Sequence, residues 1–177
     1  MKRFDRHKLL LLIFGILSIA VMVTIFLFSQ QTGKDSYNLS KTVMDQAKDR
    51  GLDVFTPQIT IKNTGTGKPS FDLNVRKWAH VYLYALLGMA TLLWCAELLR
   101  GKRLRLPAAA AMAFGICLLY ACTDEFHQTF VDSREGKAFD LIYDALGFGT
   151  SIILVLILLL LAGLIYKIHR RKTHDPH

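Results

Sequence analysis

The stretch SIILVLILLLLAGLIY, residues 151–166, decides the fold class because it is apolar on every side. A helix of a soluble protein would show a polar face repeating every 3.6 residues, and this stretch shows none. Similar apolar segments cover about 9–28, 78–99 and 106–126, and the quoted stretch belongs to one covering about 139–166. About 20 apolar residues at about 1.5 Å each match the roughly 30 Å hydrocarbon core of a bilayer. The sequence therefore predicts an all-α membrane protein with four transmembrane helices.

The first apolar segment has a second interpretation, a cleaved secretory signal. Residues 9–28 carry no charge, and this apolar region is long for a signal. The FSQQTG that follows it also lacks the small-x-small pattern of a cleavage site. We therefore expect an uncleaved spanning helix.

Basic residues predict the orientation of the helices. Four Lys or Arg residues occur in each of MKRFDRHK at 1–8, RGKRLR at 100–105 and KIHRRK at 167–172, whereas the short third connection has only Arg134 and Lys137. Cytoplasmic flanks carry the excess of Lys and Arg, so we expect both termini in the cytoplasm, with 167–177 as a cytoplasmic tail. The net charge of +8 then reflects topology, and no nucleic-acid partner is expected.

The whole chain, 1–177, is expected to form a single domain with one long extracytoplasmic loop at 29–77. That loop contains DSYNLSKTVMDQAKDRG, whose apolar spacing suits a short amphipathic helix ending at Gly51. A weak alternation around Ile59 and Ile61 follows and favours a short hairpin or an irregular lid. Such a loop is long enough to cover the outer end of a four-helix bundle.

Small residues are expected where the helices approach one another closely. Gly147 and Gly149 lie in the last apolar segment, and Gly115 lies in the third. Residues without a bulky side chain let the backbones of membrane helices pack together.

Polar side chains occur at the same end of all four predicted helices. Helical spacing places Lys77, His80 and Tyr84 on one face, Asp124 on a face with His127 and Gln128, and Asp140 on a face with Asp144. Three helices can thus direct these groups toward one another. Ionisable groups at membrane depth cost about 2.5 to 3.5 kcal/mol each, so a functional site is the default hypothesis.

The charges of this end predict an acidic pocket. Residues 124–144 contain six acids against two basic residues, a balance of −4. Basic groups on other helices, a bound divalent cation or protonated carboxyl groups can offset that charge. The HExxH and ExxH patterns of known metal sites are absent from the sequence. A set built from His80, one acid of the 124–125 pair and Asp140 is geometrically possible, but its spacing matches no known metal motif.

Two interpretations of this cluster remain open. In the first, the candidate catalytic residues act as general acids and bases or hold a divalent cation, while a second group binds the substrate. The candidate catalytic residues are His80, Asp124, Glu125 and Asp140, and the candidate substrate-binding residues are Lys77, Tyr84, Gln128, Arg134 and Asp144. In the second interpretation the polar groups only hold the helix ends together. A transporter is less favoured because the polar groups occupy one leaflet and no polar path crosses the bundle.

Three segments of the chain resemble the VanZ-like proteins, small bacterial membrane proteins named after a teicoplanin-resistance determinant. They are SQQTGKDS at 29–36, KWAHVYLYALLG at 77–88 and DEFHQTFVDSREGKAFDLIYDALGFG at 124–149. The residues that match the family pattern are Lys77, His80, Tyr84, Asp124, Glu125, Gln128, Arg134, Asp140 and Gly147. The resemblance implies a protein of the bacterial cell membrane that is linked to lowered sensitivity to teicoplanin-type glycopeptides. A cell-envelope lipid or a lipid-linked wall precursor is the expected ligand, bound or modified.

The chain departs from that family pattern at two places. Asp132 and Ser133 stand where the family usually has a proline and a glycine, and Asp144 stands where it usually has an asparagine. Aspartate lacks the amide donor and can carry a negative charge, so the second departure makes the pocket more acidic. Neither the residues nor the resemblance decides the reaction type or the oligomeric state.

Overall fold

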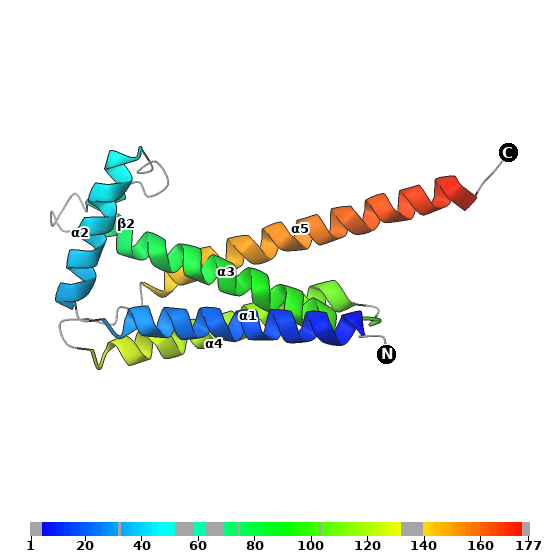
Figure 1. Cartoon of the computed structure of the whole chain (residues 1–177), viewed down its shortest axis with the longest axis horizontal. Coiled ribbons are helices and arrows are strands. Elements are labelled where there is room, and N and C mark those ends of the chain that lie inside the picture. Colours follow the sequence, from blue (N-terminus) through cyan, green and yellow to red (C-terminus); the bar gives the residue numbers. More distant parts are fainter. Residues whose placement is uncertain are drawn as a thin grey trace.

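Four long helices form the bundle of this protein, seen in a computed structural model (Figure 1). The structure describes residues 5–31, 33–51, 59–62, 69–73, 75–102, 104–131 and 140–174. The long helices are α1 (Arg6–Ser29), α3 (Val75–Leu98), α4 (Arg105–Gln128) and α5 (Leu141–His174). Each is long and apolar enough to cross a membrane, which confirms the four predicted spans.

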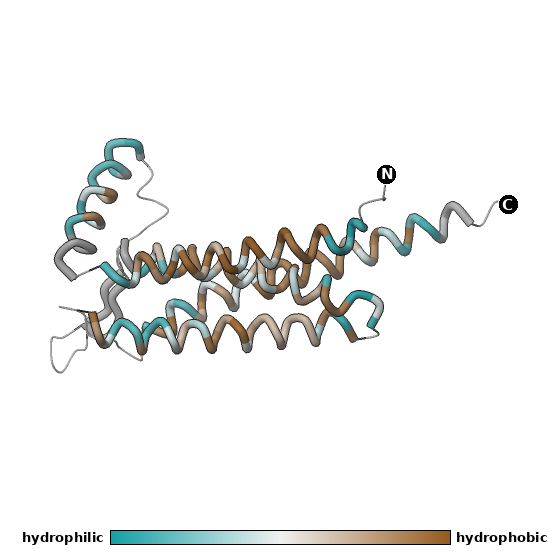
Figure 2. The backbone as a smooth tube through the Cα atoms, turned by 60° about the horizontal axis from the view of Figure 1, so that its bottom comes forward, coloured by the Kyte–Doolittle hydropathy of each residue, from teal (hydrophilic) through white to brown (hydrophobic). Residues whose placement is uncertain are grey.

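Helix α3 is the most buried of the four long helices and packs against α1, α4 and α5. In the apolar part of α3, 44% of the residues are buried, against 11% in the apolar part of α5. Helix α5 is therefore much more exposed than α3. Tyr84 and Leu87 of α3 are fully buried, together with Cys117 of α4 and Phe148 of α5. The middles of the spans are mostly hydrophobic and hydrophilic residues occupy their ends (Figure 2). Apolar side chains that face outward are what a lipid-exposed surface requires.

Helices α3 and α5 meet at two glycines. A Cβ added to Gly147 would overlap the backbone carbonyl of Val81 and lie 3.0 Å from the Cβ of Tyr84. A Cβ added to Gly88 would lie 2.8 Å from the carbonyl oxygen of Phe148. Only glycine leaves room for this approach, and small residues commonly serve this purpose in membrane bundles. The predicted close contact is thus confirmed for Gly147.

The same prediction was wrong for Gly149 and Gly115. A Cβ at either position would have no atom within 4 Å. Gly149 is two residues after Gly147, and a rotation of about 200° turns it to the opposite side of α5. Two glycines this close in sequence therefore cannot serve the same helix contact.

The segment between α1 and α3 contains α2 (Gly33–Asp49) and a two-stranded antiparallel sheet formed by β1 (Ile59–Lys62) and β2 (Pro69–Leu73). Gly51, with φ of 65°, follows the end of α2 in the left-handed conformation that favours glycine. Helix α2 contacts α3 and lies at the end of the bundle opposite to the chain termini (Figure 1). The amphipathic helix and the hairpin suggested by the sequence fall in these places.

The last helix differs at both ends from the predicted segment 139–166. It begins at Leu141, directly after Asp140, whose carbonyl oxygen accepts a hydrogen bond of 2.9 Å from the N–H of Tyr143. It ends at His174, so most of the predicted tail is helical. The basic residues after Tyr166 are good helix formers and interact favourably with the negative end of the helix dipole. The end of the apolar run therefore does not mark the end of the helix.

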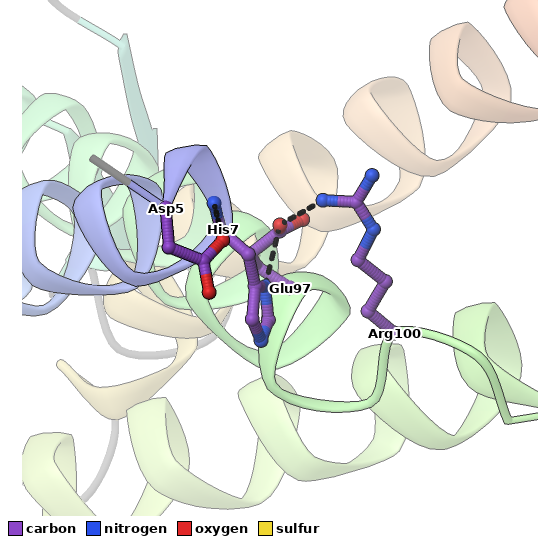
Figure 3. A network of polar contacts seen from close by, with 4 residues as sticks. All are labelled: Asp5, His7, Glu97 and Arg100. Atoms are coloured by element: carbon purple, nitrogen blue, oxygen red, sulfur yellow. Dashed lines mark hydrogen bonds and ion pairs between the residues drawn. The ribbon is translucent and has the colours of Figure 1, made fainter. Parts of the chain in front are cut away.

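The end of the bundle that holds the termini has its own polar network (Figure 3). The Oε1 of Glu97 accepts a hydrogen bond of 2.8 Å from the Nη1 of Arg100, and the Nδ1 of His7 lies 2.8 Å from the same oxygen. The side chain of Asp5 caps α1 by accepting a hydrogen bond from the N–H of His7. This network ties the start of α1 to the end of α3. It gives charged partners to Glu97, the only acid within the apolar segment predicted at 78–99.

Candidate functional site

Helix α3 contributes Lys77, His80 and Tyr84 to the opposite end of the bundle. Their spacing of three and four residues places them on one face, as predicted. The Nδ1 of His80 lies 3.3 Å from the Oδ1 of Asp144 on α5. The hydroxyl of Tyr84 donates a hydrogen bond of 3.3 Å to the Oδ2 of Asp124 on α4. This face of α3 therefore connects to both neighbouring helices.

Helix α4 contributes a buried carboxylate and a buried amide. Asp124 and Gln128 are each 3% exposed. The Nε2 of Gln128 donates hydrogen bonds to the Oδ2 of Asp124, at 3.2 Å, and to the Oγ of Ser29 on α1, at 3.4 Å. A chain of hydrogen bonds thus runs from Tyr84 through Asp124 and Gln128 to Ser29 and joins three helices.

Two acids at the start of α5 meet the basic groups of α3 in two layers. In the outer layer, the Nζ of Lys77 lies 3.5 Å from the Oδ1 of Asp140, in a pair about one quarter exposed. The same Nζ lies 3.4 Å from the hydroxyl of Tyr143 and 4.5 Å from the centre of its ring. In the inner layer, the side chain of Asp144 is 1% exposed and that of His80 is 14% exposed. The site therefore has a rim formed by Lys77 and Asp140 and a buried floor.

Three carboxylates of this site have one oxygen without a hydrogen-bond partner. Among the described residues, the buried Oδ1 of Asp124, Oε2 of Glu125 and Oδ2 of Asp144 have none. The charge of Glu125 interacts with those of Asp124, Asp140 and Asp144, which places it beside the same cluster. A buried polar group without a partner costs about 1 to 3 kcal/mol. Three such oxygens at one place indicate a binding site for hydrogen-bond donors or for a cation.

The residues able to hold a metal ion differ by one from the predicted set. His80, Asp124 and Asp144 each offer a ligand atom, and these atoms all lie within 4.8 Å of one another. The sequence pattern allowed a set with Asp140 in place of Asp144, but Asp140 is not among the residues whose ligand atoms come together. Asp140 lies at the rim, where Lys77 pairs with it. One helical turn further along α5 takes Asp144 to the depth of His80.

His127 was expected to share a face with Asp124 and Gln128, but its ring packs elsewhere. It contacts the ring of Phe26 on α1 in a tilted arrangement, with the ring centres 4.8 Å apart. Arg134 and the rest of the connection at 132–139 lie outside the described residues, so the role expected for Arg134 stays a prediction.

Sequence reasoning did not assign Tyr143 to the site. It is 1% exposed, and Lys77 contacts both its hydroxyl and its ring. The available signal was its position three residues after Asp140, which helical spacing places on a neighbouring surface of the helix. An aromatic ring next to a membrane interface is so common that this signal favours no particular role.

Comparison with known proteins gives one match. A model of the VanZ/LLP1 family matches residues 14–161, a range that includes Lys77, His80, Asp124 and Asp144. No curated protein and no solved structure matches the chain.

Proposed function

Since this chain belongs to the VanZ/LLP1 family, we propose that it binds, or acts on, the head group of a cell-envelope lipid or lipid-linked wall precursor in the bacterial cell membrane. The observation that carries this proposal is the cluster of three buried carboxylates with unpartnered oxygens at one end of the spans. We infer that this end lies at the depth of the head groups, because the spans are long and apolar enough to cross the hydrocarbon core.

The buried floor and the rim of the site suit different parts of such a head group, its hydroxyl or amine groups and its phosphate. The buried acids Asp124, Glu125 and Asp144 accept hydrogen bonds from hydroxyl or amine groups, or bind a cation that accompanies a phosphate. Lys77 at the rim can approach a phosphate, and Arg134 would bind the phosphate with two hydrogen bonds from its guanidinium group. In a reaction without a bound cation, Asp124, Glu125 or Asp140 would act as acid or base and His80 would exchange protons.

Changed teicoplanin sensitivity is the expected consequence. Binding or altering a surface lipid or wall precursor changes what a glycopeptide meets at the membrane. Strains carrying Glu125→Gln, Arg134→Ala or Asp140→Asn are expected to become more sensitive to teicoplanin, at membrane levels of the protein equal to wild type. Resistance that stays unchanged in all three strains at equal levels contradicts the proposal.

Binding is measured directly by the melting midpoint of the detergent-solubilised protein. A lipid-linked wall precursor or an anionic phospholipid is expected to raise the midpoint of the wild type, because a ligand that binds only the folded state stabilises it by mass action. Asp140→Asn is expected to reduce that shift. A midpoint that no envelope lipid changes argues against a binding pocket.

The proposal requires the site to face outward, with both termini in the cytoplasm. We expect a cysteine at position 46, exposed on α2, to react with a membrane-impermeant maleimide in intact cells. A cysteine at position 102, between α3 and α4, is expected to react only after permeabilisation. Both variants, Gln46→Cys and Lys102→Cys, are made in a Cys122→Ser background, since the other two cysteines are buried. The opposite labelling pattern would place the site in the cytoplasmic leaflet.

A scaffold without a ligand is the second candidate function. The chain of hydrogen bonds from Tyr84 to Ser29 favours it, because these contacts hold α1, α3 and α4 together. A purely structural cluster predicts that Glu125→Gln and Asp140→Asn deplete or unfold the protein, whereas a binding site predicts stable but inactive variants.

A further inference from the structure

We propose that His80, Asp124 and Asp144 bind one divalent transition-metal cation, Zn²⁺ or Mn²⁺, at the floor of the polar site. This inference rests on the proposed function, since the cation would lie in the same pocket as the head group. It adds the chemical identity of an occupant and the three side chains that hold it.

The geometry of the three side chains is close to that of a metal site. Their ligand atoms lie within 4.8 Å of one another, and the Nδ1 of His80 lies 3.3 Å from the Oδ1 of Asp144. Bonds of about 2.0 to 2.2 Å place two ligands of one ion at most about 4.4 Å apart. Small side-chain rotations therefore suffice to bring all three atoms onto one ion.

Hydrogen bonds around Asp124 occupy one of its oxygens and leave the other free. Tyr84 and Gln128 both donate to Oδ2, and Oδ1 is left buried without a partner. Metal-binding carboxylates are commonly oriented in this way by donors that do not touch the ion. The unpartnered Oδ2 of Asp144 likewise has no competing donor among the described residues. Both aspartates are thus held with a free acceptor atom.

The unpartnered oxygen of Glu125 is an independent sign that a cation is needed. Glu125 is 9% exposed, it is not one of the three ligands, and its charge interacts with those of Asp124 and Asp144. Lys77 pairs with Asp140 at the rim, outside the three ligands. Buried charges require a partner or a metal, and a doubly charged ion supplies one.

The donor set indicates which class of metal fits. One imidazole nitrogen favours Zn²⁺ and its neighbours, and two carboxylates favour harder ions such as Mn²⁺. Ca²⁺ takes six to eight oxygen ligands and Mg²⁺ usually keeps several waters, so neither suits a site built around histidine. Three protein ligands also leave a coordination position open, as in catalytic zinc sites.

The test is metal binding by the full chain in detergent after treatment with a chelator and removal of the chelator. Titration with Zn²⁺ or Mn²⁺ is expected to show one site per chain and to raise the melting midpoint, whereas Mg²⁺ and Ca²⁺ have little effect. His80→Gln and Asp144→Asn are expected to weaken binding at least about tenfold, because loss of even an outer partner of a metal ligand costs about 10- to 100-fold. Two matched controls, His127→Gln and Asp45→Asn, the second at an exposed position of α2, are expected to bind as the wild type does.

Wild-type protein alone also gives a decisive measurement, in case the variants unfold. Co²⁺ bound by the histidine is expected to show visible absorption that Zn²⁺ abolishes. Absence of saturable binding to the wild type, or equal binding by His80→Gln, Asp144→Asn and the controls, would overturn the metal site. A lipid-induced midpoint shift without any metal binding overturns this inference and leaves the proposed function standing. Metal binding without any lipid response supports the metal site and contradicts the proposed function.

Discussion

Gly147→Ala is expected to lower the melting midpoint of the solubilised protein strongly and to reduce its level in the membrane. The added Cβ would overlap the carbonyl of Val81 and press on the Cβ of Tyr84. Ordinary overpacking costs about 1 to 3 kcal/mol, and this case belongs at or above the upper end because a helix backbone cannot rotate away. Separation of α3 from α5 would also pull His80 away from Asp144.

Gly149→Ala is the matched control for that substitution. It changes the same residue type in the same helix, two positions away, and its Cβ meets no atom within 4 Å. Alanine is favoured over glycine inside a helix by about 0.8 to 1.0 kcal/mol, so this variant is expected to melt slightly higher than the wild type. Equal midpoints for Gly147→Ala and Gly149→Ala would show that α3 and α5 do not meet at Gly147.

Glu125→Gln is expected to raise the melting midpoint while it abolishes the response to ligand. The wild-type carboxylate is buried beside Asp124, Asp140 and Asp144, and one of its oxygens has no partner. Removing its negative charge relieves repulsion, and the new amide N–H groups can donate to neighbouring carboxylate oxygens, each of which costs about 1 to 3 kcal/mol while it is buried without a partner. Each kcal/mol corresponds to about 2 to 4 °C for a protein of this size.

Glu97→Gln makes the same chemical change as Glu125→Gln but is expected to have the opposite effect on the melting midpoint. The carboxylate of Glu97 accepts a hydrogen bond from Arg100 and contacts His7. The substitution removes the negative charge that strengthens both contacts and is therefore expected to lower the midpoint. A midpoint that falls for both variants would mean that Glu125 is a structural group. A rise for Glu125→Gln with loss of lipid binding is the pattern of a functional site that is built at the expense of stability.

The sequence predicts which side chains share a helix but not how the helices meet. Long runs without a polar face are sufficient to predict four spans, and a spacing of three and four is sufficient to place Lys77, His80 and Tyr84 together. The choice between Asp140 and Asp144 as the partner of His80 depends on where α5 crosses α3. The contacts at Gly88 and Gly147 determine that crossing, and no rule of spacing distinguishes Gly147 from Gly149 in advance.

The misplacement of His127 has a similar physical origin. Residues three and four positions after Asp124 both lie near its face, on either side of it. Gln128 turns toward Ser29 and the site, whereas His127 turns toward Phe26. Which side is chosen depends on the position of α1, which is distant in sequence. Helix ends are also hard to predict from hydropathy, as the continuation of α5 to His174 shows.

Helix α5 is long enough to act as a lever. It is a single helix of 34 residues, and at about 1.5 Å per residue its portion after Gly147 extends about 40 Å. Gly147, where α5 contacts α3, lies one helical turn from Asp144. A tilt of α5 by about 5° at Gly147 would move its C-terminal end by about 3 to 4 Å. A small rearrangement around an occupant of the site would thus be magnified at the opposite surface of the membrane.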